Sequence, residues 1–299
     1  MPSDIPDASL QPLCSTCWDL IRRQAQPIAG YAIVRQLGRG AMGVVNLAIR
    51  RSDGRLVALK TIIPAVAGAR AHIDRFFREA SILRDLDHPN IVAFRDMGES
   101  NGQFFFAMDY VRGYDASRLL KESGPMPIPR AARLVCQLLE ALEYAHGKGF
   151  VHRDIKPANL LVEAPGAREV AKLADFGLAR VYQTSQLSGL TMTGDLGGTV
   201  AFMAPEQIQR YREAKPPVDQ YAAGATLYNL LADKFIYDLM RNIQDQILMV
   251  LQQKPVPIQS RRPDIPKALA DIIHRAIARE VADRFPDVKT MRQALVKFC

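Results

Sequence analysis

The sequence has few cysteines and no long apolar run. Its 299 residues include only Cys14, Cys17, Cys136 and Cys299, too few for a disulfide framework in a chain of this length, which favours a reducing compartment such as the cytoplasm. No run of about 18 or more uncharged apolar residues is present, so we expect no membrane-spanning segment. The first residues are acidic and proline-bearing rather than basic and then apolar, which excludes a secretory signal.

The chain also lacks a concentrated basic patch. Its formal net charge is +8, with 48% hydrophobic and 23% charged residues, a composition typical of a globular protein. The basic residues are spread along the chain, whereas nucleic-acid binding usually needs them gathered on one surface with interleaved aromatics. We therefore expect no nucleic-acid partner, while nucleotide and peptide ligands fit the positive charge.

Residues 1–29 are predicted to be a flexible leader, because prolines recur and the apolar pattern is broken. The leader contains a lone CxxC, Cys14 to Cys17. Such a pair can be half of a zinc ribbon, but Zn²⁺ needs four ligands and no second pair lies nearby in the sequence. Two free thiols are the simpler interpretation, and a zinc module shared with a preceding segment stays open.

The periodicity from residue 30 onward predicts an α+β fold with two lobes. Short β-branched runs at 31–37, 44–49, 55–62, 91–97 and 103–108 predict antiparallel strands. Helical spacing over 70–86 predicts one helix among them. Beyond about residue 111 the pattern is helical, over 128–146 with Gly147 closing that helix, and near 217–232, 240–252, 266–278 and 287–298. The predicted domain therefore has a small β-rich lobe at 30–110 and a larger helical lobe at 111–299.

A glycine-rich turn follows the first predicted strand. Gly38, Gly40 and Gly43 fit the pattern G-x-G-x-x-G-x-V. In a dinucleotide-binding fold a helix follows this pattern directly, but here a strand follows. The sequence therefore favours a hairpin that lies over phosphate groups, where glycine lets backbone N–H groups approach closely.

Four further motifs carry charged or amide side chains at separate places in the chain. Lys60 ends Val-Ala-Leu-Lys, residues 152–159 read His-Arg-Asp-Ile-Lys-Pro-Ala-Asn, Asp175 begins Asp-Phe-Gly, and Glu206 ends Ala-Pro-Glu. Each motif alone could arise by chance. In this order they supply what phosphoryl transfer needs, which is neutralised charge, a held metal and an oriented acceptor.

This set of motifs resembles bacterial eukaryotic-like (Hanks-type) serine/threonine protein kinases, from about residue 31 to residue 298. The resemblance implies transfer of the γ-phosphate of ATP to serine or threonine hydroxyls of protein substrates, with Mg²⁺ and with Mn²⁺ able to substitute. Lys156-Pro157-Ala158-Asn159 has the serine/threonine form. The departures are peripheral: Asp109 stands where glutamate is common, and a glycine is doubled before Thr199.

The resemblance also implies roles for individual residues. Asp154 would be the catalytic base, and Lys156 would stabilise charge on the transferring group. Lys60 would hold the α- and β-phosphates and pair with Glu79, although Asp74 and Asp85 lie on the same predicted helix. The oxygen ligands suited to Mg²⁺ would be Asn159 and Asp175.

Adenine would lie between two apolar layers. By the same resemblance Val45 and Ala58 lie above the ring, Leu161 lies below it and Met108 is the gatekeeper. The backbone of Asp109 and Val111 would bond the ring edge. Ordinary core packing is the alternative for the apolar side chains.

Other residues are assigned structural roles. Glu206 would form a buried ion pair with Arg284, and Asp219 would hold the backbone of the catalytic loop, with a surface carboxylate as the alternative for Asp219. Thr199 would hydrogen-bond Asp154 and Lys156.

Regulation is expected between Asp175 and Glu206. The resemblance favours Thr191 and Thr193 as autophosphorylation sites, because they have the spacing seen in the bacterial kinases. A phosphate in this segment could pair with Arg153 and order it. Threonines that are merely solvated are the alternative.

Three other classes of protein compete with an active kinase. A pseudokinase would lack Lys60, Asp154 or Asp175, a small-molecule phosphotransferase usually lacks Ala-Pro-Glu, and an interaction module would have no reason to carry the metal ligands.

We expect a cytoplasmic protein, or the cytoplasmic part of a longer membrane receptor, because the chain stops where the last predicted helix ends. A dimer of kinase domains is possible.

Overall fold

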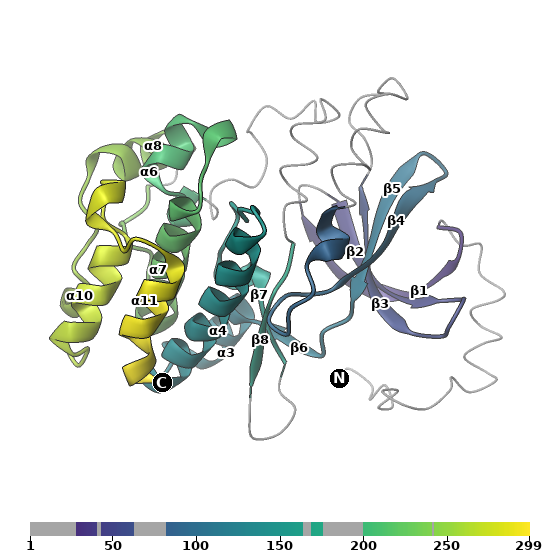
Figure 1. Cartoon of the computed structure of the whole chain (residues 1–299), viewed down its shortest axis with the longest axis horizontal. Coiled ribbons are helices and arrows are strands. Elements are labelled where there is room, and N and C mark those ends of the chain that lie inside the picture. Colours follow the sequence, from purple (N-terminus) through teal and green to yellow (C-terminus); the bar gives the residue numbers. More distant parts are fainter. Residues whose placement is uncertain (1–27, 41–42, 63–81, 164–168, 176–199, 241) are drawn as a thin grey trace. The chain divides into compact units, whose positions relative to one another are not determined.

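A computed structural model of the chain describes residues 28–40, 43–62, 82–163, 169–175, 200–240 and 242–299 (Figure 1). The chain divides into two compact units, one made from residues 1–67 and 94–110, the other from residues 68–93 and 111–299. The predicted leader with its CxxC lies outside the described residues. So does the predicted helix up to residue 81.

The first unit contains a five-stranded antiparallel sheet in the order β1-β2-β3-β5-β4. Its strands are β1 (Tyr31–Gly40), β2 (Gly43–Arg50), β3 (Leu56–Ile62), β4 (Phe94–Ser100) and β5 (Gln103–Asp109). The β-branched and aromatic residues of these runs favour strands, and a tight turn at residues 101–102 joins β4 to β5. The predicted meander is confirmed.

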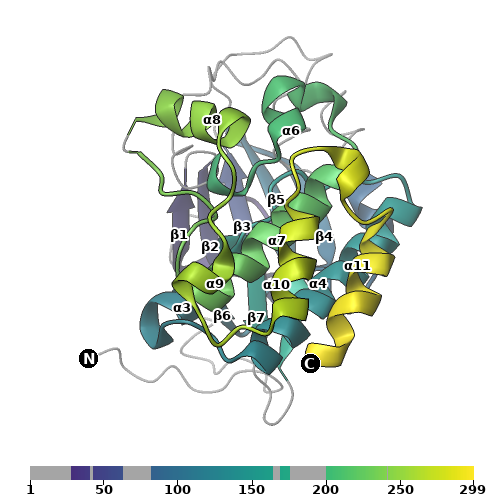
Figure 2. The same ribbon diagram turned by 90° about the vertical axis from the view of Figure 1, so that its left-hand side faces the viewer.

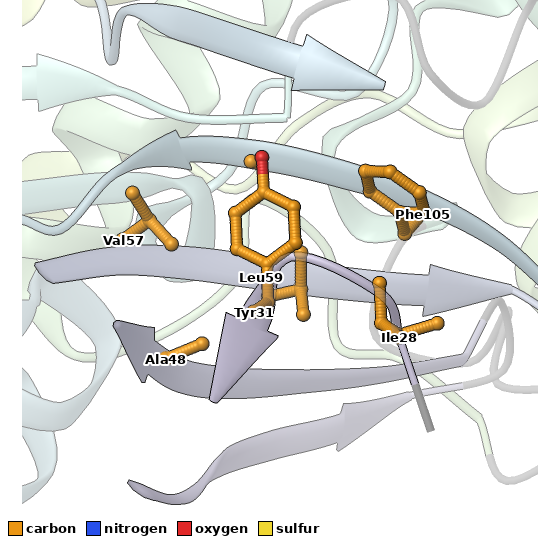
Figure 3. Close-up of a cluster of buried hydrophobic side chains, with 7 residues drawn as sticks. Ile28, Tyr31, Ala48, Val57, Leu59 and Phe105 are labelled. Atoms are coloured by element: carbon orange, nitrogen blue, oxygen red, sulfur yellow. The ribbon is translucent and has the colours of Figure 1, made fainter. Parts of the chain in front are cut away.

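One face of this sheet carries an apolar cluster. Figure 3 shows side chains of four strands and of the segment before β1 gathered on the same side of the sheet. The alternation of β3 directs Val57 and Leu59 to this face, and Tyr31 covers them while its hydroxyl donates to Asp96 at 2.8 Å. Burial and that hydrogen bond raise the pKa of the Tyr31 phenol, which stays neutral. The cluster comprises Ile28, Tyr31, Ala48, Val57, Leu59, Phe105 and Ala107.

The fourth strand begins later than its sequence suggests. The prediction started it at Ile91, but the strand starts at Phe94, and residues 82–93 group with the second unit. Ile91 forms a parallel bridge with Leu173, and Val92 donates its N–H to the Leu173 carbonyl at 2.9 Å. The apolar run at 91–97 therefore takes part in two separate strand pairings: its first residues pair with Leu173, and its later residues form β4. Sequence periodicity alone cannot show where one pairing ends and the other begins.

The second unit is mostly helical, with a three-stranded antiparallel sheet in the order β6-β7-β8. The strands are β6 (Gly113–Asp115), β7 (Leu160–Glu163) and β8 (Val170–Leu173). The α-helices are α3 (Ala116–Ser123), α4 (Ile128–Gly147), α6 (Pro205–Gln209), α7 (Pro217–Ala232), α8 (Ile243–Gln252), α9 (Ile258–Arg261), α10 (Lys267–Ala276) and α11 (Val288–Leu295). Short 3-10 turns are η1 (Ile82–Asp85), η2 (Pro157–Asn159), η3 (Val200–Phe202), η4 (Tyr211–Glu213), η5 (Val281–Asp283) and η6 (Val296–Phe298).

Helix α7 lies at the centre of the helical unit. It packs against α4 and α10, while α11 covers α4 (Figures 1 and 2). Nearly every residue of α7 is buried, as expected for a helix surrounded by others. Gly224 marks the close approach of α7 to α10, because a Cβ there would lie 2.8 Å from the Ala276 Cβ. The α+β prediction, with a small antiparallel β unit and a larger helical unit, is confirmed.

The end of α4 differs in detail from the prediction. Gly147 is the last residue of the helix and does not close it. The left-handed backbone falls instead on Gly149, with φ of 80°. The N–H groups of Gly149 and Phe150 then cap the carbonyls of His146 and Ala145, the usual way in which a glycine ends a helix.

No helix in the described part of the chain is both long enough and apolar enough to cross a membrane.

Candidate active site

Two of the glycines of the predicted phosphate hairpin have different surroundings. Gly43 has φ of 138°, and a Cβ there would lie 1.9 Å from the Thr61 carbonyl oxygen of β3. At Gly38 a Cβ would meet no atom of the described residues within 4 Å. Gly43 is therefore required by the sheet itself, whereas the freedom at Gly38 leaves room for a ligand to approach the backbone.

We expect Gly43→Ala to destabilise the protein by at least about 2 kcal/mol, because the new methyl group meets backbone and the φ is unfavourable for an L-residue. Gly38→Ala is the matched control and should change stability by less than about 0.5 kcal/mol. Thermal melts of the two variants and the wild type measure the difference. Equal melting temperatures for the two variants would contradict the conclusion that the sheet requires a glycine at position 43.

Lys60 lies on the sheet face opposite the apolar cluster. Residues directly paired across antiparallel strands share a face, and Lys60 pairs with Val45 of β2 while Ala58 pairs with Met108 of β5. The predicted ligand-binding side chains of Val45, Ala58, Lys60 and Met108 therefore lie on one face. Lys60 is only 6% exposed, so it differs from an ordinary solvated lysine.

The end of β5 carries an exposed ion pair. Asp109 binds Arg95 through both carboxylate oxygens. Its side chain is thus engaged within the sheet, which leaves only its backbone for the predicted contact with an adenine edge. Val111, the other predicted backbone contact, is buried in the second unit.

The segment 152–159 brings together, in the second unit, two predicted catalytic side chains and one predicted metal ligand. Lys156 donates its Nζ to both carboxylate oxygens of Asp154, at 3.0 and 3.1 Å. Asn159 donates its Nδ2 to the Asp154 backbone carbonyl at 2.7 Å and to the Asp154 Oδ2 at 3.0 Å. The side chains of Asp154 and Lys156 remain about one-fifth exposed, at 21% and 22%. The carboxylate is therefore positioned by two donors and still accessible.

Asp219, near the start of α7, holds the backbone of this loop. Its Oδ2 accepts the N–H of His152 and its Oδ1 accepts the N–H of Arg153, both at 2.8 Å. The Asp219 side chain is fully buried, which excludes the alternative of a surface carboxylate. The hydrogen bond from the Arg153 N–H stabilises a strained backbone, because Arg153 has φ of 70°. Such a conformation persists only where the surrounding structure enforces it.

Asp175 follows β8, which is tied to the same loop. Ala174, the residue before it, donates its N–H to the Asn159 carbonyl at 2.9 Å. The Ala174 carbonyl in turn contacts the His152 Nε2 at 2.9 Å. Asp175 itself has φ of 60°, another left-handed backbone at a non-glycine residue. The two loops that carry Asn159 and Asp175 are therefore bound to each other.

The donors at this point fit a hard cation. Asn159 uses its Nδ2 on Asp154, which leaves its Oδ1 to act as an oxygen ligand, and Asp175 adds a carboxylate. Oxygen donors with few protein ligands suit Mg²⁺, which keeps several waters. In the described ranges no group of three or more His, Cys, Asp or Glu residues could hold a metal, so a zinc site is not found there.

Arg284 forms the most extensively bonded ion pair of the second unit. Its Nη1 and Nη2 bind the two Glu206 carboxylate oxygens at 2.7 and 2.8 Å. The remaining donors reach the carbonyls of Ala278, Pro217 and Arg279. All five guanidinium N–H directions are used, and the Arg284 side chain is 0% exposed. The segment that begins at Glu206 is thus bound to the start of α7 and to the segment after α10.

The guanidinium of Arg153 has contacts of its own. Its Nη1 donates to the Tyr211 carbonyl at 3.4 Å and its Nη2 to the Ala214 carbonyl at 3.1 Å. The predicted partners of Arg153, Thr191 and Thr193, lie outside the described residues, as do Glu79 and Thr199. Leu161 lies in β7 on the face opposite the buried Leu160 and Val162.

Two residues that the sequence analysis did not single out support the loop. His146, near the end of α4, contacts the Asp219 Oδ2 through its Nε2 at 2.8 Å. Gln207, in α6, donates to the Arg153 carbonyl at 2.7 Å and is 1% exposed. His146 is the last residue of a predicted helix and Gln207 directly follows Ala-Pro-Glu, so their positions were predictable from the sequence but their hydrogen-bond partners were not.

Comparison with known proteins agrees with this arrangement. The protein kinase domain family matches residues 31–296, which is most of the chain. The chain belongs to the protein kinase domain family. The kinase domain of PknI from Mycobacterium tuberculosis, known from a crystal structure, is 30% identical with a TM-score of 0.70, over 92% of this chain and 99% of that chain.

Longer relatives carry a similar kinase domain. The serine/threonine-protein kinase PknF of Mycobacterium tuberculosis is 37% identical over 275 residues, which cover 91% of this chain and 57% of PknF. The probable serine/threonine-protein kinase PknB of Lactococcus lactis is 32% identical, over 87% of this chain and 40% of that protein. The chain thus spans about half the length of these relatives, and it is similar to the bacterial Hanks-type serine/threonine kinases.

Proposed function

We propose that the chain transfers the γ-phosphate of ATP to serine or threonine hydroxyls of protein substrates. The observation that carries this proposal is the accessible Asp154 carboxylate, held by Lys156 and Asn159 on a loop that the buried Asp219 fixes. The strained backbone at Arg153 and the buried Asp219 carboxylate both cost folding free energy. That cost favours a functional role for the loop over a purely structural one.

Each residue has a definite task in the proposed reaction. Asp154 accepts a hydrogen bond from the acceptor hydroxyl and orients its oxygen toward the γ-phosphorus. As the new O–P bond forms, the bond from the γ-phosphorus to the β–γ bridging oxygen breaks, ADP leaves with that oxygen, and Asp154 takes up the hydroxyl proton. Lys156, which contacts Asp154, places its positive charge where the phosphoryl oxygens carry negative charge in the transition state. Lys60 binds the α- and β-phosphates, and paired Glu79 orients it.

The nucleotide base is proposed, by the family resemblance, to contact four apolar residues. Val45, Ala58 and Met108 share one face of the first sheet, and the partly exposed Leu161 is available on β7. The Asp109 and Val111 backbone groups bond the ring edge, and Gly38, Gly40 and Gly43 shape the hairpin over the phosphates. Asn159 and Asp175 would hold Mg²⁺, which would supply positive charge to the phosphates, and Mn²⁺ would substitute because the ligands are oxygens.

A radiolabel transfer assay tests the proposal. We expect label from γ-labelled ATP on a generic basic protein in the presence of Mg²⁺, and none in excess chelator. Asp154→Asn is the control, because it keeps the size of the side chain and removes the base. Label on a small-molecule acceptor but never on protein would favour a small-molecule phosphotransferase, and no label at all would favour a pseudokinase.

The proposed protein substrate agrees with the Glu206–Arg284 pair. Glu206 is fixed to the helical core by the two hydrogen bonds of its bidentate pair with Arg284, and Arg284 is itself held by three backbone carbonyls. A fixed segment at this point could present a surface for an extended peptide, which a small-molecule acceptor does not need. PknF and PknB are longer than this chain. We also propose that the chain is cytoplasmic, either by itself or as the kinase domain of a longer membrane protein, and that such domains form dimers.

We expect autophosphorylation at Thr191 and Thr193. A phosphate adds about two negative charges, and Arg153 would exchange its contacts with the Tyr211 and Ala214 carbonyls for the phosphate. Mass spectrometry after incubation with MgATP should find phosphate between residues 182 and 193. The Thr191→Ala/Thr193→Ala double variant should lose activity. Full activity in that variant, or no phosphate in the segment, would leave only the catalytic part of the proposal.

A further inference from the structure

Two cysteines of the second unit lie in contact although they are far apart in sequence. The Cys299 thiol donates to the Cys136 sulfur with 3.4 Å between the two Sγ atoms, across 163 residues of chain. Cys136 belongs to α4, whose buried side faces the helical core, and Cys299 directly follows η6, which packs on α4. Neither residue contributes to the candidate active site.

The two thiols differ in accessibility. Cys136 is buried at 7% exposure, whereas Cys299 is exposed. Burial raises the pKa of the Cys136 thiol, and the contact with Cys299 raises it further. An oxidant in solvent therefore meets Cys299 first, and Cys136 is shielded from direct reaction.

The separation is short enough for a covalent bond. A disulfide has an S–S distance of about 2.05 Å, so the two sulfurs need to approach by only about 1.4 Å. Cys299 follows a single short turn, and its N–H bonds to the Val296 carbonyl at 3.1 Å. A rotation of one exposed side chain at the end of this turn is a small change compared with moving α4.

We propose that Cys136 and Cys299 are a redox modification site, at which a hydroperoxide such as hydrogen peroxide closes a reversible disulfide between α4 and the segment after α11. Cys299 reacts with hydrogen peroxide to give its sulfenic acid and one water. The Cys136 sulfur then attacks the sulfenic sulfur, the S–O bond breaks, and the departing hydroxide takes the Cys136 proton and leaves as a second water. A dithiol reductant reverses the bond by thiol–disulfide exchange.

The bond would strengthen the attachment of the C-terminal turns to the core. It closes a loop of 163 residues, and long loops lose the most chain entropy in the unfolded state. The same region already holds Arg292 of α11 to Glu140 and Glu143 of α4. We therefore expect the oxidised form to melt about 5 °C or more above the reduced form.

Peptide mapping of the native chain tests the proposal. The protein is treated with hydrogen peroxide, free thiols are blocked with an alkylating agent, and the digest is analysed without reductant. We expect a cross-linked peptide pair that contains Cys136 and Cys299, lighter by two hydrogen atoms than its two parts. The pair should disappear after dithiothreitol. A Cys14→Ser/Cys17→Ser background removes the competing cysteines.

Two variants distinguish the bond from other effects of oxidation. Cys299→Ser, an exposed change that leaves the fold intact, should abolish both the cross-link and the rise in melting temperature. Cys136→Ala should do the same and leave Cys299 to oxidise to sulfinic acid. The proposal is wrong if folded wild-type protein accumulates sulfinic or sulfonic acid at Cys299 without the cross-link. It is also wrong if the cross-link forms only in urea.

Discussion

Asp175→Asn is expected to lower the rate of phosphoryl transfer by about a hundredfold or more, because it removes a charge from the proposed metal site. The substitution leaves the local backbone intact. Asp175 has φ of 60°, a conformation that asparagine adopts as readily as aspartate. Asp175→Ala would remove the charge and also strain the backbone, and the two effects on the rate could not be told apart. Asp175→Asn is therefore the more informative variant.

Lys60→Met should have an effect of similar size. Methionine preserves the apolar part of the lysine side chain on its buried sheet face while deleting the ammonium group. Lys267→Met and Asp271→Asn are matched controls, because these residues form an exposed pair on α10 with 80% and 62% of their side chains accessible. Initial rates and thermal melts are measured on all four variants. Turnover within about threefold of wild type for either site variant would refute the assignment of that residue.

Arg284→Ala is expected to destabilise the protein by about 3–5 kcal/mol, since it leaves a partly buried carboxylate and three carbonyls without their donor. Arg284 also lies over the ring of the buried Tyr221, with 5.0 Å between the guanidinium carbon and the ring centre. Burial raises the pKa of the Tyr221 hydroxyl, so that group stays neutral. The melting temperature should fall on the order of 10 °C.

Arg118→Ala is the matched control for this variant. Arg118 also pairs with a glutamate, Glu122, one turn along α3, but both side chains are about half exposed. Solvent screens such pairs, so the change in melting temperature should be small. If Arg284→Ala melts at the same temperature as Arg118→Ala, the buried pair does not anchor the helical unit.

Periodicity predicted the elements that bury one continuous face. The helix at 217–232 has the predicted bounds, and the helix at 128–146 ends only one residue later. Short elements were missed because their signals are local. Helix α3 begins after Asp115, whose side chain accepts the N–H of Arg118 at 2.9 Å, a capping signal that the sequence does contain. Strand β6 has three residues, too few for any alternation to appear.

The candidate site was predictable wherever a motif names its own residues. Asp154, Lys156 and Asn159 are neighbours in sequence and in space. The partners of Asp219 and the contacts of the Arg153 guanidinium depend on how helices pack over 58 to 73 residues of separation, which no local pattern encodes. Predicted residues such as Glu79 and Thr191 lie outside the described residues and stay predictions.

The buried Asp219 means that the catalytic loop does not set its own geometry. The strained backbone at Arg153 takes its shape from the first turn of α7, and α7 in turn meets α10 at Gly224, where there is no room for a methyl group. Inactivating mutations in a genetic screen should therefore not be confined to the motifs. They should also appear along the α7–α10 contact, at residues that touch neither nucleotide nor substrate.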